Sequence, residues 1–363
     1  MRGVLQVLAP SEGGIRRHVR YLATHPPPGY ATVGIVGPGE LATYFDGLPF
    51  VASSPETPSF FRLRAGSRLA ACVDLVHAHG FSAARHALAL RRWGDRPARV
   101  PVVVTVHSSP DQTLGRALPG ARLPLAQRAA WLIGRIIARR ADAVIAVAPD
   151  AAARLGGAHF IPPAVDPRPP SRSRDEVRAE LRTPSDAVVV LCVARLHPDK
   201  GLDLLVKALR GSAAQAWIAG EGPERPKLER LIGGSPVRLL GHRSDIPDLL
   251  HAADIFVLPS RGDAYPLALV EARAAGLPIV ATRVGAVPEV VGDAGIIVDP
   301  GDLRGLGEAL GALIASEALR ARPGARPGAR PGGKDGASSP PSAEELVARI
   351  GKVYDEVCGY SGP

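Results

Sequence analysis

Two successive series of short apolar runs, separated by helical patterns, constrain this chain more than any other feature. In the first half, runs rich in β-branched residues predict strands at residues 4–9, 31–36, 73–79, 100–107 and 143–148. The second half repeats the scheme at residues 187–194, 214–220, 237–241, 255–259, 277–282 and 295–299. Helices are expected between them at 14–24, 82–93, 123–140, 201–210, 223–232, 245–252, 266–275 and 303–315. Nearly continuous apolar strands separated by helices are typical of parallel sheets covered on both faces.

Two such series predict an α/β protein with two Rossmann-like domains, although the pattern alone does not exclude a barrel. We expect an N-terminal domain at 1–166 and a C-terminal domain at 175–315, because residues 161–176 are rich in proline and charge. The repeated Arg-Pro-Gly-Ala unit makes residues 316–341 a predicted flexible segment. Residues 342–358 carry a capping pattern and predict a helix, which we expect to dock across the domain junction.

The charge balance is basic, with 44 Lys and Arg against 35 Asp and Glu, a formal net charge of +9. Such a balance fits nucleic acid, anionic lipid or phosphorylated small molecules as partners. Part of the excess comes from residues 320–330, which hold four arginines and no acid. Because no zinc finger and no aromatic RNA-binding strand is recognisable, we expect no nucleic-acid partner.

Three cysteines, Cys72, Cys192 and Cys358, lie far apart without the spacing of a metal site, so we expect a reducing compartment and no disulfide framework. The N-terminal residues are typical of a first strand rather than a signal peptide. No stretch of 18 uncharged apolar residues is present, which predicts no spanning helix. We therefore expect a cytoplasmic protein.

Two cations, Arg195 and Lys200, follow the first strand of the second series, just before the helix that opens at Gly201. In parallel α/β sheets, ligands bind beyond the carboxyl ends of the strands, where helix N-termini add a positive dipole. Arginine can grip two phosphate oxygens, and lysine acts as a point charge. The pair fits a diphosphate; two solvated surface charges are the alternative.

Gly13 and Gly14 are the counterpart in the first half, where they follow a strand and open a helix. They would let backbone N–H groups approach a phosphate, although neither a GxGxxG fingerprint nor a P-loop is present. His107 ends the strongest strand of this half and could hydrogen-bond a sugar hydroxyl, unless it is simply a satisfied strand-end histidine. His77 and His79 alternate along their strand, so at most one is expected to face a ligand.

Asp263 and Glu271 lie eight residues apart, after the strand at 255–259. If the whole interval were helical, it would span about 12 Å. Two carboxylates at that distance cannot share a proton or flank one bond, as glycosidase carboxylates do at about 5–10 Å. They could hold opposite ends of an extended ligand such as a nucleotide sugar, with Glu271 accepting from the ribose hydroxyls and Asp263 near the hexose.

The second half, in the ordered motifs of residues 193–209, 218–231, 237–282 and 284–302, resembles glycosyltransferase family 4. The first half resembles that family more loosely, through SEGGIRRHV, VTVHSSP and ADAVIAVAP. The resemblance implies a retaining enzyme of the GT-B type, in which two Rossmann-like domains face each other across a deep cleft. It also implies a nucleoside-diphosphate sugar as co-substrate, with no cofactor and no catalytic metal, because the basic pair offsets the leaving charge.

The resemblance assigns roles to individual residues. Arg195 and Lys200 match the pair that binds the donor diphosphate, and Glu271 matches the ribose-binding acid of the family's E-x7-E motif. Gly14 matches the glycine turn near the donor phosphates. His107 matches the histidine that contacts the transferring sugar. The catalytic set is therefore expected to comprise His107, Asp263, Arg195 and Lys200.

Two departures from the family pattern occur at the first acid of that motif. It is Asp263 rather than Glu, and Ala264-Tyr265-Pro266 replaces the usual Gly-Phe-Gly or Gly-Phe-Pro. The lost glycine narrows backbone freedom where N–H groups would meet the sugar. We interpret the change as a variation that affects sugar choice; a weakly active nucleotide-sugar-binding homologue is one alternative. A nucleotide-sugar epimerase is another, although the first half offers no convincing acid/base pair.

The acceptor is expected to be a saccharide or a lipid-linked group, in glycolipid, cell-envelope polysaccharide or small-molecule glycoside synthesis. Its contacts should come from the variable loops at 41–66 and 108–124. Aromatic and basic residues in the first loop suggest peripheral contact with the inner membrane face, with ordinary packing as the alternative. These residues are Phe60, Phe61, Arg62 and Arg64.

Overall fold

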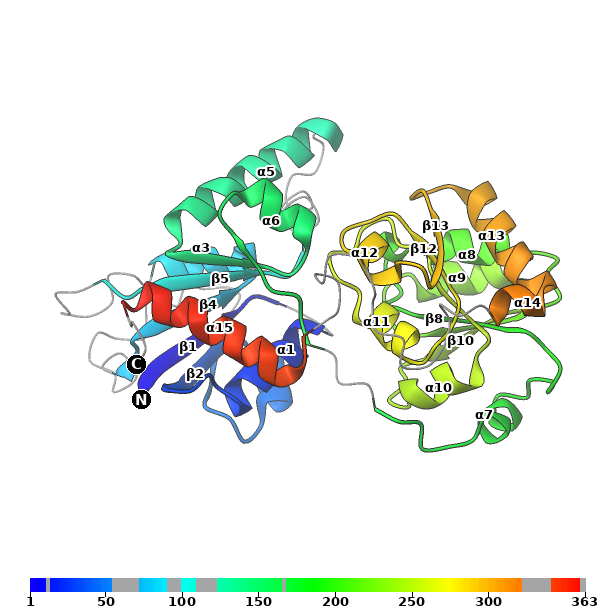
Figure 1. Cartoon of the computed structure of the whole chain (residues 1–363), viewed down its shortest axis with the longest axis horizontal. Coiled ribbons are helices and arrows are strands. Elements are labelled where there is room, and N and C mark those ends of the chain that lie inside the picture. The colour runs from blue at the N-terminus through cyan, green and yellow to red at the C-terminus, as the bar shows by residue number, and fades with distance from the viewer. Residues whose placement is uncertain are drawn as a thin grey trace. The chain divides into compact units, whose positions relative to one another are not determined.

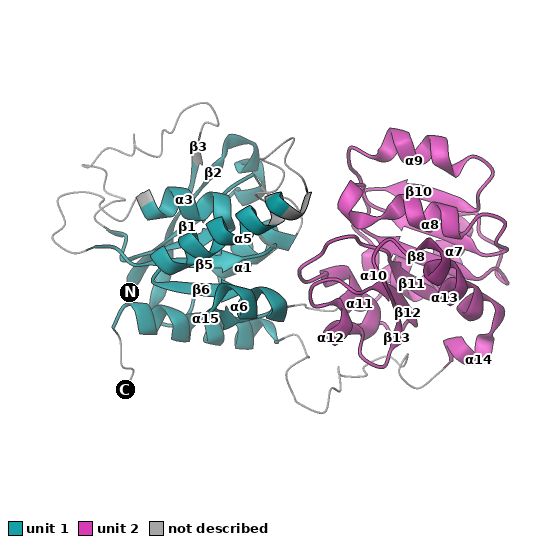
Figure 2. Ribbon diagram, turned by 90° about the horizontal axis from the view of Figure 1, so that it is seen from above, with its two compact units in different colours: residues 1–164, 341–363 teal, residues 165–340 magenta. Residues whose placement is uncertain are grey.

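The computed structural model describes residues 1–10, 14–53, 72–89, 99–108, 123–164, 168–321 and 341–359. Figure 1 labels the helices and strands. The chain divides into two compact units, Met1–Ala164 with Pro341–Pro363 and Val165–Pro340 (Figure 2). Several predictions fall outside the described residues, namely those on Gly13, Phe60, Phe61, Arg62, Arg64, loop 108–124 beyond Ser108 and before Leu123, and residues 322–340.

The first unit holds a seven-stranded sheet in the order β3-β2-β1-β4-β5-β6-β7, and all its printed pairings are parallel. Its strands are β1 (Arg2–Leu8), β2 (Tyr30–Pro38), β3 (Phe50–Ser53), β4 (Leu75–His79), β5 (Val102–Val106), β6 (Ala143–Ala146) and β7 (His159–Phe160). Its helices are α1 (Gly14–Thr24), η1 (Gly39–Leu41), η2 (Thr43–Phe45), α3 (Phe81–Ala89), α5 (Leu123–Arg140), α6 (Pro149–Leu155) and α15 (Ala343–Val357).

Helices cover both faces of this sheet because its strands are apolar on both sides. In β5, Val102 and Val104 belong to the cluster that also holds residues of α3 and α5. Val103, between them, belongs to the cluster formed with α15 and with Leu22 of α1. Successive side chains of a strand point to opposite faces, so α3 and α5 lie on one face and α1 and α15 on the other.

Helix α15 packs on the sheet of the first unit (Figure 1). Its side chains Leu346, Ile350 and Val353 join Val4 of β1 in one buried cluster. The predicted helix itself is confirmed, with the complete capping box that begins at Ser342. The apolar stripe of α15 covers a face of the sheet that would otherwise be exposed to water. This burial explains why the helix packs there.

The second unit holds a six-stranded sheet in the order β10-β9-β8-β11-β12-β13, again with parallel printed pairings. Its strands are β8 (Val189–Val193), β9 (Gln215–Ala219), β10 (Val237–Gly241), β11 (Ile255–Leu258), β12 (Ile279–Thr282) and β13 (Gly295–Val298). Its helices are α7 (Arg174–Glu180), η6 (Pro198–Lys200), α8 (Leu202–Ala208), α9 (Arg225–Ile232), α10 (Ile246–Ala252), α11 (Leu267–Ala274), α12 (Val287–Val291), α13 (Leu303–Ala315) and α14 (Glu317–Arg320).

The predicted α/β class with two Rossmann-like sheets is confirmed. Each sheet reverses its winding direction between its first and fourth strands, at β1/β4 and at β8/β11. In open parallel sheets such a reversal marks the point where ligands bind, beyond the carboxyl ends of the strands. The fold therefore presents one candidate ligand edge on each unit.

Some short elements escaped the prediction, namely β3, β7, α6, α7, α12 and α14. Residues 317–320, expected to be flexible, form α14 instead. The Ser316 hydroxyl accepts a hydrogen bond from the Leu319 N–H at 3.3 Å, and Arg320 donates to the carbonyl of Leu313 at 2.7 Å. These two contacts stabilise a further helical turn beyond the end of the predicted helix.

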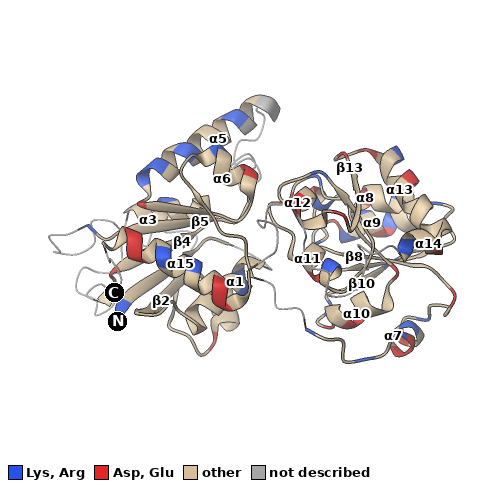
Figure 3. Ribbon diagram, in the orientation of Figure 1, with Lys and Arg blue, Asp and Glu red and all other residues tan. Residues whose placement is uncertain are grey.

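Helix α5 exposes both apolar and basic side chains. Four large apolar residues on it are exposed, at 68%, 61%, 38% and 42% for Leu125, Leu132, Ile133 and Ile136. Figure 3 shows Lys and Arg recurring along this helix, and its sequence contains no acid. The exposed arginines are Arg128, Arg135, Arg139 and Arg140. Among the described residues, no helix is both long enough and apolar enough to cross a bilayer.

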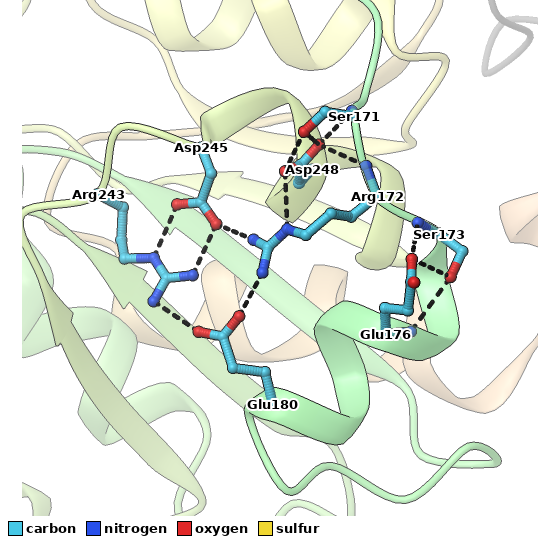
Figure 4. Close-up of polar contacts among 8 residues, drawn as sticks. All are labelled: Ser171, Arg172, Ser173, Glu176, Glu180, Arg243, Asp245 and Asp248. Carbon is cyan, nitrogen blue, oxygen red and sulfur yellow. Dashed lines mark hydrogen bonds and ion pairs between the residues drawn. The ribbon is translucent and has the colours of Figure 1, made fainter.

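An ion-pair network fastens the first described residues of the second unit to α10 (Figure 4). The guanidinium of Arg172 contacts the carboxylates of Glu180, Asp245 and Asp248, the last at 3.0 Å from Nε. The Ser171 backbone N–H donates to Asp248 at 2.6 Å. Burial alone would raise the pKa of Asp248, but the hydrogen bonds from Ser171 and Arg172 outweigh it and lower that pKa to about 2.

Candidate functional site

The carboxyl edge of the second sheet carries most of the predicted site residues. Arg195 is exposed two residues beyond β8, and Lys200 ends the short helix η6 in the same loop. Asp263 lies in the loop after β11, the strand next to β8. The Lys200 ammonium forms an ion pair with the Asp263 carboxylate, and the two side chains are only 17% and 13% exposed. Adjacent strands thus bring together two residues that are 63 positions apart.

Close backbone packing fixes the loop of Lys200 against the loop of Asp263. Gly201 adopts a φ of +62°, and a Cβ there would lie 2.0 Å from the carbonyl oxygen of Pro259, so only glycine fits. The Arg261 N–H donates to the carbonyl of Asp199 at 2.7 Å. The Arg261 guanidinium grips both carboxylate oxygens of Asp203, at 2.7 and 2.9 Å, and lowers the pKa of that carboxyl.

The loop after β12 fixes the backbone of Asp263 from the other side. Gly285 has a φ of +48°, and a Cβ on it would lie 2.0 Å from the carbonyl oxygen of Asp263. The Ala286 N–H donates to the Ala264 carbonyl at 2.9 Å. Ala264, where the family pattern has glycine, is buried, and burial raises the pKa of the neighbouring Tyr265. The shorter acid therefore reaches Lys200 from a backbone that is held on both sides.

Glu271 is half-buried within α11, the helix that follows Asp263. The helix begins only at Leu267, so the four residues from Asp263 to Pro266 are not helical. The interval is thus only partly helical, as predicted, and the span of about 12 Å for a wholly helical interval does not give the separation of the two acids. Both acids nevertheless lie in the connection that follows β11, Asp263 in its loop and Glu271 in its helix.

In the first unit, Gly14 opens α1 after β1, and His107 directly follows β5. His107 Nε2 and His79 Nδ1 share a hydrogen bond of 3.2 Å. His79 Nε2 lies 2.8 Å from the Gln6 side-chain oxygen, to which it donates. His107 is thus at the carboxyl edge that the sequence predicted, and it has a histidine partner that the sequence did not reveal.

Both ring nitrogens of His77 form hydrogen bonds with buried side chains of the first unit. Its Nδ1 shares a 2.7 Å hydrogen bond with the Tyr354 hydroxyl, and its Nε2 shares another of 2.7 Å with the Thr105 hydroxyl. Both partners are buried, and Tyr354 comes from α15. His77 therefore ties the C-terminal helix to the first sheet, whereas His79 on the same strand adjoins His107.

His18 of α1 is a further member of this histidine cluster, and the sequence reasoning missed it. Its ring centroid lies 5.6 Å from that of His79 and 5.0 Å from that of His107. Burial lowers the pKa of His18 to about 4 and lowers the pKa values of His79 and His107 well below the usual range. The available signal was helical spacing, because His18 lies four residues before Leu22, a core residue of the same helix.

Comparisons with known proteins identify similar sequences for both units. The sequence model of Glycosyltransferase Family 4 matches residues 12–168, and that of Glycosyl transferases group 1 matches residues 187–316. A D-inositol 3-phosphate glycosyltransferase of Xylanimonas cellulosilytica is 33% identical over 284 residues, which cover 69% of this chain and 65% of that protein. A GDP-mannose-dependent alpha-(1-6)-phosphatidylinositol dimannoside mannosyltransferase of Mycobacterium tuberculosis is 32% identical, over 58% of each chain. The matched region thus spans less than two thirds of either relative.

Solved structures share the fold along nearly the whole chain. HepE of Anabaena, in complex with UDP, has a TM-score of 0.76 at 20% identity and covers 98% of this chain and 100% of its own. Sucrose-phosphate synthase from Thermosynechococcus elongatus has a TM-score of 0.73 at 19% identity, covering 99% and 100%. These two structures show that the fold is shared. The two sequence models, which match most of both units, show that the chain belongs to glycosyltransferase family 4.

Proposed function

We propose that this chain transfers a hexose-type sugar from a nucleoside-diphosphate sugar to an acceptor hydroxyl, with retention of configuration. The observation that carries the proposal is the pairing of Lys200, from the loop that also holds Arg195, with Asp263 at the point where the second sheet reverses its winding. The names of its relatives describe glycosyl and mannosyl transfer, and HepE binds UDP. These likenesses support the same general chemistry here.

Within the second unit, Arg195 and Lys200 are proposed to bind the diphosphate, and Glu271 to accept hydrogen bonds from the ribose. Asp263 orients Lys200 and is proposed to lie near the hexose. From the first unit, Gly13 and Gly14 are proposed to meet the donor phosphates. His107 is neutral, as its lowered pKa requires, and can therefore accept a hydrogen bond from a sugar hydroxyl.

In the proposed reaction, the bond between the anomeric carbon and the diphosphate oxygen breaks, while the acceptor oxygen bonds to the same face of that carbon. The proton of the acceptor hydroxyl passes to the departing phosphate oxygen. Lys200 and Arg195 stabilise the negative charge that develops on the diphosphate. Two fixed cations supply this stabilisation without requiring a bound metal, and no side chain has to act as a covalent nucleophile.

We also propose that the acceptor is reached at an anionic membrane surface, with α5 as the contact. This helix combines exposed leucine and isoleucine side chains with arginines and no acid, which is the composition of helices that lie in a lipid interface. Sedimentation with vesicles containing anionic lipid should therefore carry the protein down, whereas vesicles of neutral lipid should not. Leu132→Ser should weaken the binding, and the matched control Ile296→Ser, an exposed isoleucine of the second unit, should not.

Product analysis with a panel of nucleotide sugars tests the transfer itself. A nucleoside diphosphate released together with a glycosylated acceptor would support the proposal. An isomerised sugar would identify an epimerase instead, and donor binding without turnover would identify a binding homologue. Lys200→Ala and Glu271→Ala should each abolish most of the turnover, whereas Lys207→Ala, which removes an exposed lysine of α8, should not.

A further inference from the structure

A row of hydrogen-bonded side chains crosses three neighbouring strands of the first sheet. Gln6 lies on β1, His79 ends β4 and His107 follows β5, and β4 lies between the other two strands. Gln6 and His79 are buried, whereas His107 is only partly buried. The row therefore leads from the interior of the sheet to its carboxyl edge, where His107 is proposed to contact the donor sugar.

The hydrogen bonds in this row run in one direction. Burial lowers the pKa values of His79 and His107 well below the usual range, so each ring is neutral at pH 7, with one donating and one accepting nitrogen. The Gln6 side-chain oxygen can only accept, so His79 Nε2, at 2.8 Å, carries the proton and His79 Nδ1 accepts. His107 Nε2 must then donate across the 3.2 Å hydrogen bond to His79 Nδ1. The remaining ring nitrogen of His107, Nδ1, therefore carries a lone pair.

The C-terminal helix fixes the orientation of the Gln6 amide. Burial raises the pKa of Tyr354 in α15, and a hydrogen bond from the Gln6 side chain opposes that rise. An N–H donor has this effect, because it stabilises the ionised form of the hydroxyl. The amide nitrogen of Gln6 therefore faces Tyr354, which leaves the amide oxygen to accept from His79.

Two neighbouring rings hold the imidazole of His107 in place. The His79 ring lies at a centroid distance of 5.4 Å, and the His18 ring stands edge-on at 5.0 Å. A half-turn of the His107 ring would put a carbon in the place of Nε2 and break the hydrogen bond to His79. Because that bond satisfies the buried Nδ1 atom of His79, its loss is unfavourable. Both the tautomer and the orientation of His107 are thus set by its neighbours.

We propose that Gln6 and His79 are positioning residues, which hold His107 in the tautomer protonated on Nε2 so that Nδ1 accepts a hydrogen bond from a hydroxyl of the donor sugar. This inference rests on the proposed function and specifies its substrate, because the sugar must offer a hydrogen-bond donor at the point that His107 contacts. A sugar that presented only an acceptor there, such as fluorine or a carbonyl oxygen, would meet the lone pair of Nδ1 and would be disfavoured.

NMR of the full chain with nitrogen-labelled histidine tests this assignment through a signal that does not depend on activity. We expect His107 to populate one neutral tautomer, protonated on Nε2, with a scalar coupling across the hydrogen bond to His79 Nδ1. The variant His107→Asn identifies the resonances of His107. Gln6→Leu removes the fixed acceptor, so both tautomers of His79 and His107 should become populated. Gln215→Leu, the same change on β9 of the second unit, should leave the tautomer of His107 unchanged.

Circular dichroism establishes that Gln6→Leu is folded. If it is not, His79→Leu supplies the same measurement, with His86→Leu as its control at an exposed position of the same unit. With a donor that the wild type turns over, Gln6→Leu should lower kcat/KM by about twofold or more, because only the competent tautomer of His107 accepts from the sugar. Gln215→Leu should keep the wild-type value.

Two results would overturn the proposal. One is a proton on Nδ1 of His107 in the wild-type chain. The other is an unchanged tautomer of His107 in both Gln6→Leu and His79→Leu. A chain that showed the expected tautomer but turned over no nucleotide sugar would instead refute only the proposed function.

Discussion

Replacing Lys200 by methionine removes one positive charge from the candidate diphosphate site and keeps most of the side-chain volume. A hydrogen bond to a charged group contributes about 1.5–3 kcal/mol. In the unliganded protein, however, Lys200 already pairs with Asp263, and both side chains are more than four-fifths buried. A bound diphosphate would share the Lys200 ammonium with Asp263, so part of its interaction replaces one that already exists. We therefore expect the loss of binding free energy to lie at the lower end of this range, about 1.5 kcal/mol. That loss corresponds to a roughly tenfold weaker affinity for UDP or GDP.

Isothermal titration of UDP and GDP into the wild-type chain and Lys200→Met measures this loss. Lys207→Met is the matched control, because it makes the same charge change at an exposed position of α8. Uridine and guanosine are the matched ligands, since a nucleoside without phosphate should bind both variants equally. If Lys200→Met remained folded and bound the diphosphates as tightly as Lys207→Met, Lys200 would not be a diphosphate contact.

Three further outcomes are expected. Glu271→Gln should weaken UDP binding about tenfold, the effect of losing a charged hydrogen-bond acceptor, but should leave a 2′,3′-dideoxy analogue unaffected in titration; an equal loss for both nucleotides would contradict the ribose contact. Tyr354→Phe leaves His77 Nδ1 without its buried partner and should cost about 1–3 kcal/mol in urea unfolding; a change below about 0.5 kcal/mol would show that the hydroxyl is dispensable. The pKa of Asp248 is lowered to about 2 in the folded chain, so its stabilisation is present above the unfolded pKa of about 3.8 and is lost as the pH falls towards 2. Asp248→Asn should therefore be less stable than wild type by about 2 kcal/mol at pH 7, with the two unfolding curves converging between about pH 4 and pH 2; a constant difference would reject this linkage.

The sequence predicted the regular elements well where apolar periodicity was strong. The limits of α1, α5 and α13 coincide with the predicted ranges, because their apolar residues recur at helical spacing between clear breaks. Helix α7, RDEVRAE, escaped detection since it offers almost no apolar stripe and is held by ion pairs instead. The sequence did not identify the surface of the first unit that α15 covers, because a helical pattern shows that a face is apolar, but not what packs against it.

The candidate site was only partly accessible from the sequence for a related reason. Lys200 and Asp263 each follow a strand, but only the order of strands in the sheet makes those two strands neighbours. The supporting contacts depend on backbone geometry, as with the close approach of Gly285 to the Asp263 carbonyl, which no residue pattern specifies. His18 was missed because it sits in a helix with an ordinary core-facing spacing, and its neighbours come from two distant strands.

The proposed function requires a nucleoside diphosphate to bind at the carboxyl edge of the second sheet, against Arg195 and Lys200. A crystal of the chain soaked with UDP or GDP tests it directly. We expect pyrophosphate oxygens within hydrogen-bond distance of both side chains, with the ribose hydroxyls against Glu271. Density for the pyrophosphate at any other edge of the molecule, with Lys200 still paired only to Asp263, would contradict it.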